Sequence, residues 1–449
     1  MARRKWVIVF FALSAFVGLA IPQRPLAVLV AVSLVILSLL FTLGPEHGLL
    51  GSYMLIVIAL NVKEAARLHE ALAVNAIWIV SAGYAGCCMV RYGLRALHKT
   101  NPLTVTDLLL LAYILWGLAV SLVVGDVGMA LERVCSLVMV YVLFFRCFRL
   151  VIKGVLARNT VEDLVRIISG GFWLSGLLTL VYVMYRPDQA AIPAVVPWVK
   201  PFNRAQGIFG TPNALGMNMA VGMGWSLTGL WLAQRFRWKI ALVTGLAICG
   251  TAVFLTNSRA SIFYAFTYAI VAGLGYYGSR RATVKLVYGM IVSVALGLYL
   301  RYLPDLSVLK DYISRGQADV LVDRRALIRL SYDLATERPL GYGWGCLPPL
   351  NMPIDNAYVV VLLETGWPGL LLYASFLCSM LLKAVDVSRK VSKYDRMYRV
   401  SWSCTGLIAA GIVHGAFESS ISSPLVMVTQ SVLVAWLLVQ GLTRVSEKR

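Results

Sequence analysis

Blocks of apolar residues recur along this chain, each long enough for one helix to cross a membrane, with short polar or basic stretches between them. A bilayer core of about 30 Å is crossed by a helix of roughly 20 apolar residues. Backbone groups in lipid must pair within the protein, which favours helices over open strands. Only 14% of the residues are charged, against about 25% in an average soluble domain. The sequence therefore predicts an all-α polytopic membrane protein.

The apolar blocks predict about fourteen transmembrane helices, with about twelve as the lower limit because the first three blocks are short. An even number of spans places both termini on one side of the membrane. Most Lys and Arg residues fall in the segments that this topology assigns to the cytoplasm, as the positive-inside rule requires. Both termini are therefore expected in the cytoplasm. The expected spans are 7–21, 26–43, 49–62, 71–90, 108–124, 134–148, 167–185, 212–233, 240–256, 260–278, 284–303, 366–383, 400–420 and 425–442.

The net charge of +20 is explained by the basic rim of such a protein, which faces anionic lipid headgroups. We therefore expect the lipid bilayer and not a nucleic acid as the partner of this charge. The eight cysteines show no metal-ligand spacing, and the external loops carry no Asp-x-Asp pair. We expect neither a metal nor another cofactor.

Two external loops, 186–211 and 304–365, are much longer than the others. Loops longer than about 12–15 residues are usually functional or disordered, and the Trp, Tyr, Leu and Pro residues of these two favour a small structured, helical cap. External arginines concentrate here, where membrane orientation does not require them. We divide the chain into N-terminal spans (1–185), a catalytic core with both loops (186–385) and C-terminal spans (386–449).

The first long loop ends in an arginine and a turn before the next span. Pro212 suits the first position of a helix, and Asn213 follows it. Gly207 and Gly210 serve either a tight turn or the close approach of the backbone to a ligand. Arg204 lies just above the external membrane surface, where a guanidinium group can bind a diphosphate.

The external link between spans 240–256 and 260–278 is very short and contains Arg259. This arginine must lie at the edge of the hydrocarbon, where a charge is costly without a partner. Its side chain either reaches out to water or binds an anionic, lipid-linked ligand. The hydroxyl of Ser258 and the amide of Asn257 suit the second alternative.

The second long loop predicts a helix that Asp323 caps and that ends before Pro339. Arg325 and Arg329 lie one helical turn apart and are interpreted as solvated. Arg324 lies one position round the helix from them and can point elsewhere. A glycine-rich turn follows, and its Tyr342 and Trp344 are suited to contact sugar rings. The helix has an apolar face that is expected to lie on the membrane or on the spans; it consists of Leu327, Ile328, Leu330 and Leu334.

Asp355 and Asn356 precede a short apolar helix that Gly and Pro interrupt before the span 366–383. Asp355 is either the N-cap of that helix or a general base, since a carboxylate can accept the proton of a sugar hydroxyl. Glu364 is a weaker candidate base, because it lies two to three helical turns beyond Asp355 at about 3.6 residues per turn.

Four short motif pieces, drawn from the segments described above, follow one another in a recognisable order. This order resembles the O-antigen ligase and polymerase family of bacterial surface-polysaccharide enzymes. The motif residues that carry the resemblance lie within residues 200–385. The remainder of the chain resembles the family only in its pattern of hydropathy. The pieces are Arg-x-x-Gly-x-Phe-x-x-Pro-Asn at 204–213, Asn-Ser-Arg at 257–259, Arg…Pro-Leu-Gly-x-Gly at 324–343 and Asp-Asn-x-Tyr…Glu-x-Gly-x-x-Gly at 355–369.

The resemblance implies a glycosyltransferase that takes a glycan from undecaprenyl diphosphate and joins it to a hydroxyl of an acceptor glycolipid. The active site would face the periplasm, on the outer side of the bacterial plasma (inner) membrane. Arg204, Arg259 and Arg324 fall on motif arginines and are expected to bind the diphosphate, whose charge grows as the glycosidic bond breaks. Asp355 is the expected catalytic residue. The expected supporting residues near the acceptor are Asn213, Ser258, Tyr342, Asn356 and Glu364.

Family ligases carry His where this chain has Asp355, so the role of that His does not transfer directly. The aspartate favours a surface-polysaccharide polymerase, whose acceptor is another lipid-linked repeat unit. The alternative is a ligase that acts on lipid A-core. A flippase for lipid-linked oligosaccharides is the rival of another class, although transporters usually place charges near the bilayer midplane in two similar halves. Whether a separate chain-length regulator binds is left open.

Overall fold

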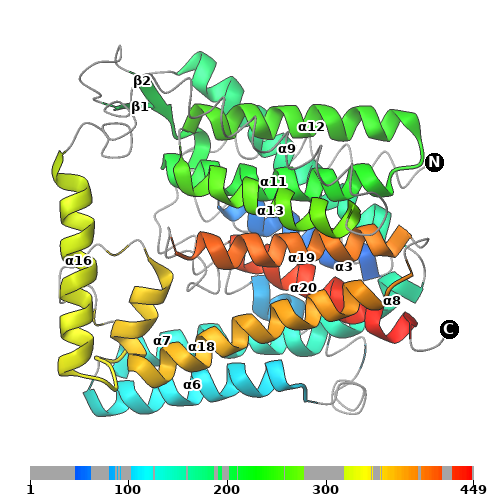
Figure 1. Ribbon diagram of the computed structural model, residues 1–449. Coiled ribbons are helices and arrows are strands. Elements are labelled where there is room, and N and C mark those ends of the chain that lie inside the picture. The colour runs from blue at the N-terminus through cyan, green and yellow to red at the C-terminus, as the bar shows by residue number, and fades with distance from the viewer. Residues whose placement is uncertain are drawn as a thin grey trace.

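The structure, a computed structural model, describes residues 46–61, 80–85, 88, 92, 103–124, 127–157, 160–186, 191–194, 202–209, 211–256, 258–277, 318–344, 346, 354, 356–392, 396–416 and 427–446. Within these ranges most helices run side by side in a bundle, and one helix, α16, lies across an end of it (Figure 1). The helices are α3 (Glu46–Leu60), α6 (Val105–Val124), α7 (Val127–Val140), η1 (Tyr141–Cys147), α8 (Phe148–Ala157), α9 (Val161–Tyr185), α11 (Pro212–Leu232), α12 (Phe236–Thr256), α13 (Arg259–Tyr277), α16 (Ala318–Glu337), α18 (Ala357–Lys390), α19 (Arg396–His414) and α20 (Met427–Ser446).

The helices follow the apolar blocks of the sequence. Both α11 and α13 match the predicted spans 212–233 and 260–278 to within one residue at each end. Five helices in the described ranges are long and apolar enough to cross a membrane. The helical, membrane-spanning class is therefore confirmed. The number of fourteen stays a prediction, because spans such as 7–21 and 284–303 lie outside the described residues.

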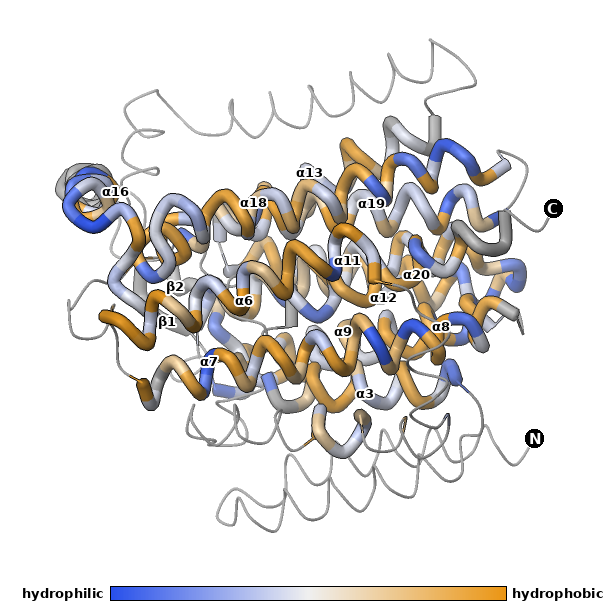
Figure 2. The backbone as a smooth tube through the Cα atoms, turned by 90° about the horizontal axis from the view of Figure 1, so that it is seen from below, coloured by the Kyte–Doolittle hydropathy of each residue, from blue (hydrophilic) through white to orange (hydrophobic). Residues whose placement is uncertain are grey.

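Hydropathy varies along the helices as a membrane bundle requires. Hydrophobic residues cover most of the length of the bundle helices, whereas hydrophilic residues gather on α16 and toward helix ends (Figure 2). Large apolar side chains such as Leu115, Val123 and Phe254 are exposed on the outside of the described bundle. Exposed apolar side chains on spanning helices are expected where lipid is the solvent.

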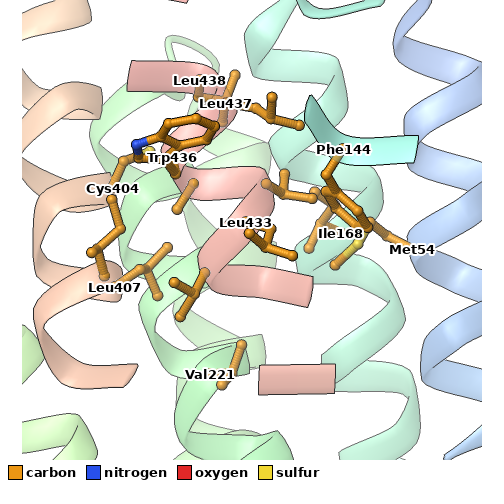
Figure 3. Packing of buried hydrophobic residues seen from close by; sticks show 14 of the residues in the cluster. Met54, Phe144, Ile168, Val221, Cys404, Leu407, Leu433, Trp436, Leu437 and Leu438 are labelled. Atoms are coloured by element: carbon orange, nitrogen blue, oxygen red, sulfur yellow. The ribbon is translucent and has the colours of Figure 1, made fainter. Parts of the chain in front are cut away.

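The core is built around α20. Trp436 is fully buried, and its ring lies 4.8 Å from that of Phe145 in η1. Figure 3 shows side chains of neighbouring helices pointing toward this helix, among them Val221, Cys404 and Leu407. Glycines allow further close approach, since a Cβ atom on Gly222 would lie 2.7 Å from Phe172. Small residues at helix contacts are typical of packing between membrane helices.

A buried ion pair joins α6 to α8 at the end of the bundle away from α16 (Figure 1). Arg149 donates to both carboxylate oxygens of Asp107, over 2.8 and 2.9 Å. Thr104 donates its backbone N–H and its hydroxyl to the same carboxylate. The Arg149 guanidinium also lies 5.2 Å from the ring centroid of Trp436. The pair therefore ties three helices together.

We expect Asp107→Ala to lower the free energy of unfolding by about 3–5 kcal/mol, because it leaves the Arg149 guanidinium buried without its carboxylate. The double variant Asp107→Ala/Arg149→Met removes both charges and should recover most of that loss. Thermal unfolding of the detergent-purified protein measures both variants. An equal loss in the single and the double variant would contradict the ion-pair explanation.

The loop 186–211 contains strands as well as turns. β1 (Ala191–Ala194) and β2 (Phe202–Ala205) pair antiparallel, with Ile192 opposite Arg204. A single turn of 3-10 helix, η2 (Gly207–Phe209), follows and is buried. The expectation of a wholly helical cap is therefore wrong for this loop, because the two arms of the loop pair with each other through their backbones.

The helix α16 differs from its prediction at one end. It ends at Glu337, as predicted, but begins at Ala318, so Asp323 lies inside it and is not its cap. The preceding residues extend the helix because none of them is Gly or Pro. Ser331 and Ala335 form the buried face, whereas Ile328 and Leu330 of the expected apolar face are exposed. The helix packs on α18, where the ring of Tyr332 contacts that of Trp367.

Candidate functional site

Four motif pieces lie toward one end of the bundle, which we call the cap end. It is formed by the starts of α11, α13 and α18, the ends of α12 and α19, the β1–β2 ribbon and α16 (Figure 1). The elements that carry these pieces contact one another, as described in turn below.

The start of α11 contacts the short link between α12 and α13. A Cβ atom on Gly216 would lie 2.7 Å from the Thr256 hydroxyl oxygen and 3.0 Å from Cβ of Ser258, so only glycine fits here. The Ser258 hydroxyl is buried and accepts a hydrogen bond of 2.9 Å from Ser261. Asn213 is half-buried in the first turn of α11. The first two motif pieces are therefore side by side. The buried Ser258 is part of the packing between them.

The start of α18 rests on the end of α19, which in turn contacts α13. The ring of His414 lies edge-on to the ring of Tyr264 in α13, with 6.0 Å between centroids. The backbone N–H of Ala357 donates to the carbonyl of Gly415 over 2.9 Å, and the Asn356 side chain donates to the carbonyl of Ala416 over 2.8 Å. A chain of contacts thus connects α13, which begins at the Asn-Ser-Arg piece, through α19 to the start of α18.

Asn356 is the N-cap of α18. Its side-chain oxygen accepts hydrogen bonds from the backbone N–H groups of Tyr358 (3.0 Å) and Val359 (3.1 Å). The capping alternative for Asp355 is therefore wrong, because Asn356 occupies the capping position. Asp355 itself lies outside the described residues, one position before this cap.

The glycine-rich turn docks on a break in α18. The helix is interrupted at Gly366, with φ 68° and ψ −172°, which confirms the predicted interruption by Gly and Pro. The turn and the break are joined by three backbone hydrogen bonds, so the backbone around Glu364 is held in place. They run from Tyr342 N to Leu363 O (2.8 Å), from Gly343 N to Glu364 O (2.9 Å) and from Trp367 N to Pro339 O (2.9 Å).

Replacing Gly366 by alanine is expected to destabilise the protein by about 2–6 kcal/mol, from the left-handed backbone and from steric overlap together. A Cβ atom there would lie 2.7 Å from the backbone nitrogen of Gly341. Thermal unfolding measures the loss. Gly250→Ala in α12 is the matched control, since its Cβ would meet only Met223, at 3.9 Å. Equal stability of the two variants would contradict the docking of the turn.

The two aromatic side chains of the turn have different surroundings. Trp344 is 1% exposed and fills the space beside Gly117, so its suggested contact with sugar rings is wrong. Tyr342 is half-buried, with the Arg338 guanidinium 4.9 Å from its ring centroid. Burial raises the pKa of the Tyr342 hydroxyl, which donates to the carbonyl of Leu334 over 3.3 Å. Tyr342 therefore mainly holds the turn against α16.

Exposed aromatic rings do occur nearby. Tyr332 of α16 and Trp367 of α18 meet edge to face, with 5.9 Å between ring centroids. They are 54% and 37% exposed, which leaves ring surface for a ligand. The sequence did not predict that these two rings are neighbours, because the two residues belong to different motif pieces.

Sequence reasoning also missed Arg133. This residue lies in α7, and its Nη2 atom is 3.9 Å from Oε2 of Glu364. Like Arg259, it is a basic residue at the cap-end edge of a predicted span, and this position was the one sequence feature that could have indicated it. It lies in no motif piece, and the sequence separation from Glu364 hides the pairing.

The motif arginines are described through their backbones. Arg204 lies in β2, Arg259 is the first residue of α13, and Arg324 lies within α16. Each therefore belongs to an element of the cap end. Among the residues that the structure describes, no group of three or more His, Cys, Asp or Glu side chains could hold a metal ion.

Residues 244–374 match the family model described as O-antigen ligase. The match contains Arg259, Arg324, Asp355 and Glu364, whereas Arg204 precedes it. A search of curated proteins finds no match to the chain. The match confirms the resemblance to the O-antigen ligase and polymerase family, on residues that include three of the four motif pieces.

Proposed function

We propose that this membrane protein transfers a glycan from undecaprenyl diphosphate to a sugar hydroxyl of an acceptor glycolipid, at the cap end and on the periplasmic side. One observation carries the proposal. The elements that carry motif pieces far apart in sequence contact one another at one end of a membrane bundle, within a chain that matches the O-antigen ligase family. A packing role alone would not require arginines in three of these pieces.

The proposed reaction is a single displacement. The acceptor oxygen attacks the anomeric carbon of the donor glycan, and a new glycosidic bond forms. The bond from that carbon to the diphosphate oxygen breaks, and its electron pair leaves with undecaprenyl diphosphate. Asp355 takes the proton of the acceptor hydroxyl as general base, and a single displacement inverts the anomeric centre.

The arginines stabilise the negative charge of the leaving group. The diphosphate gains negative charge as the glycosidic bond breaks, and fixed guanidinium groups stabilise that charge without a metal ion. Arg204, Arg259 and Arg324 are assigned to this task. Arg259 opens α13 directly after the buried Ser258, so its backbone is held by the packing of α11 against the α12–α13 link.

A polymerase is the favoured form of this activity. Asp355 replaces the His that family ligases carry, and the acceptor would then be a second lipid-linked repeat unit. A ligase that joins the glycan to lipid A-core is the alternative. A flippase is disfavoured, because the motif arginines gather at one end of the bundle and not near its middle (Figure 1).

The test uses the purified full chain with an undecaprenyl-diphosphate oligosaccharide and EDTA. A ladder of longer lipid-linked glycans is the result expected of a polymerase. Transfer that begins only when lipid A-core is added would make the protein a ligase. Absence of transfer to both acceptors, with movement of the lipid-linked glycan across vesicles, would overturn the proposal in favour of a flippase.

A further inference from the structure

One face of α18 is exposed from the break at Gly366 onward. Between Gly366 and Leu382 the exposed positions are 367, 371, 375, 378 and 382, which recur every three or four residues and so form one helix face. Leu371 and Leu382 on this face are 66% and 69% exposed. Because Ala357–Lys390 is long and apolar enough to cross a membrane, this exposed face is the side of α18 that lipid covers.

Trp367 stands at the cap end of this lipid-facing side. Its ring is partly exposed, and Leu371 lies one helical turn further along the same face. The backbone N–H of Trp367 donates to the carbonyl of Pro339 over 2.9 Å, so the docked turn fixes its place. A tryptophan at the end of a lipid-facing surface is typical of the membrane–water interface, where the ring lies among the headgroups.

The exposed surface continues from α18 onto α16. The ring of Tyr332 meets that of Trp367 edge to face, with 5.9 Å between centroids. Ile328 precedes Tyr332 by one helical turn on the same side of α16, and both side chains are more than half exposed. These residues form one row, which we call the exposed row: Leu371, Trp367, Tyr332 and Ile328.

The direction of α16 suits a place on the membrane surface. Figure 2 shows α16 almost end-on at the cap end, whereas the bundle helices run across the view. Since the bundle helices cross the membrane, α16 runs along its plane. Arg329 and Asp333 are exposed on the side of α16 opposite the buried Ser331 and Ala335. A charged side and an apolar flank are typical of a helix that lies in the interface.

We propose that the exposed row rests in the outer leaflet of the bilayer, which makes α16 a membrane-surface helix. The partner is the boundary between lipid headgroups and acyl chains. The rings of Tyr332 and Trp367 contact the headgroup region, and Leu371 extends the contact to the acyl chains. Sugar binding by the two rings is disfavoured, because aliphatic side chains continue the row on both sides.

The membrane contact has a consequence for one of the motif arginines. Arg324 lies in α16, four residues and thus about one helical turn before Ile328. A helix held at the membrane surface keeps this turn near a diphosphate that remains attached to its lipid. This consequence rests on the proposed function, whereas the membrane contact itself does not.

The first test uses the full chain in vesicles of phosphatidylethanolamine and phosphatidylglycerol. The photoreactive amino acid p-benzoylphenylalanine is placed at position 332, and lipid adducts are measured by mass spectrometry after irradiation. We expect attachment to acyl chains there. The matched control places the same amino acid at position 333, because Asp333 is exposed on the charged side of α16. We expect the lipid adduct to be lost at this position.

Trp367 allows a second measurement that leaves α16 unchanged. The difference in fluorescence between the wild type and Trp367→Phe is the contribution of Trp367. Lipids that carry bromine near the headgroup end of their acyl chains should quench this contribution. Trp225→Phe is the control, since Trp225 is fully buried in α11 and its contribution should persist.

Lipid adducts at position 332 and not at 333, together with quenching of Trp367, would support the membrane contact. Equal lipid adducts at both positions, or Trp367 fluorescence that brominated lipid leaves unchanged, would overturn it. Attachment of position 332 to the sugars of an added undecaprenyl-diphosphate oligosaccharide, and not to acyl chains, would also overturn it and assign the rings to substrate. Neither measurement requires glycan transfer, so failure of transfer would count against the proposed function alone.

Discussion

Asp355→Ala is expected to lower the rate of glycan joining by about 10²–10⁴-fold, the usual contribution of a general base. The acceptor hydroxyl must lose a proton as its oxygen attacks, and Asp355 is the carboxylate of the Asp-Asn motif piece. Asn356 already caps α18, so the change should leave the start of that helix intact. The initial rate of ladder formation measures the effect on the purified full chain.

Two companion measurements keep this prediction specific. The thermal unfolding temperature of Asp355→Ala should equal that of the wild type, because the hydrogen bonds of the cap come from Asn356. Asp355→His should retain part of the rate, since imidazole is also a general base and is the residue that family ligases carry at this position. Normal joining by Asp355→Ala would remove Asp355 from the mechanism.

The spans could be predicted because a bilayer imposes a length and an apolar composition on each of them. The start of α11 at Pro212 and the break at Gly366 could also be predicted, since Pro and Gly act locally on the backbone. These features depend on a few adjacent residues. They need no knowledge of how the chain folds back on itself.

The ion pairs could not be predicted, because each joins residues that are far apart in sequence. Asp107 lies 42 positions from Arg149, and the two meet only after α6 and α8 have packed. Arg133 meets Glu364 across an even longer separation. The predicted topology placed Arg149 among the cytoplasmic basic residues and Arg133 among the external ones, but the positive-inside rule records charge and not contact.

The motif residues divide in a similar way. The sequence grouped Tyr342 and Trp344 as a sugar platform because both are aromatic and adjacent. Packing against α6 buries Trp344, and Arg338 covers part of Tyr342. The exposed rings belong instead to Tyr332 and Trp367, which tertiary contact brings together.

Arg259→Ala is expected to lower kcat/KM by about 10²–10³-fold, which is the usual effect of removing one donor to a developing negative charge. Its backbone opens α13 beside the buried Ser258, and Gly216 fixes that link against α11. The position of the Arg259 backbone is therefore set by helix packing. Initial rates at varied donor concentration measure the effect.

Arg259→Lys should retain a larger part of the activity than Arg259→Ala, since it keeps the charge but loses the bidentate geometry toward phosphate. Arg237→Ala is the matched control, because Arg237 is an exposed arginine at the opposite end of α12 and should be silent. If Arg259→Lys and Arg259→Ala lost activity equally while both proteins stayed folded, hydrogen-bond geometry would outweigh charge. If Arg259→Ala instead left joining intact, the diphosphate would have to be bound by the other motif arginines alone. Accumulation of the lipid-linked glycan on the cytoplasmic side of cells carrying Arg259→Ala would give the residue a role in transport and would contradict the enzymatic assignment.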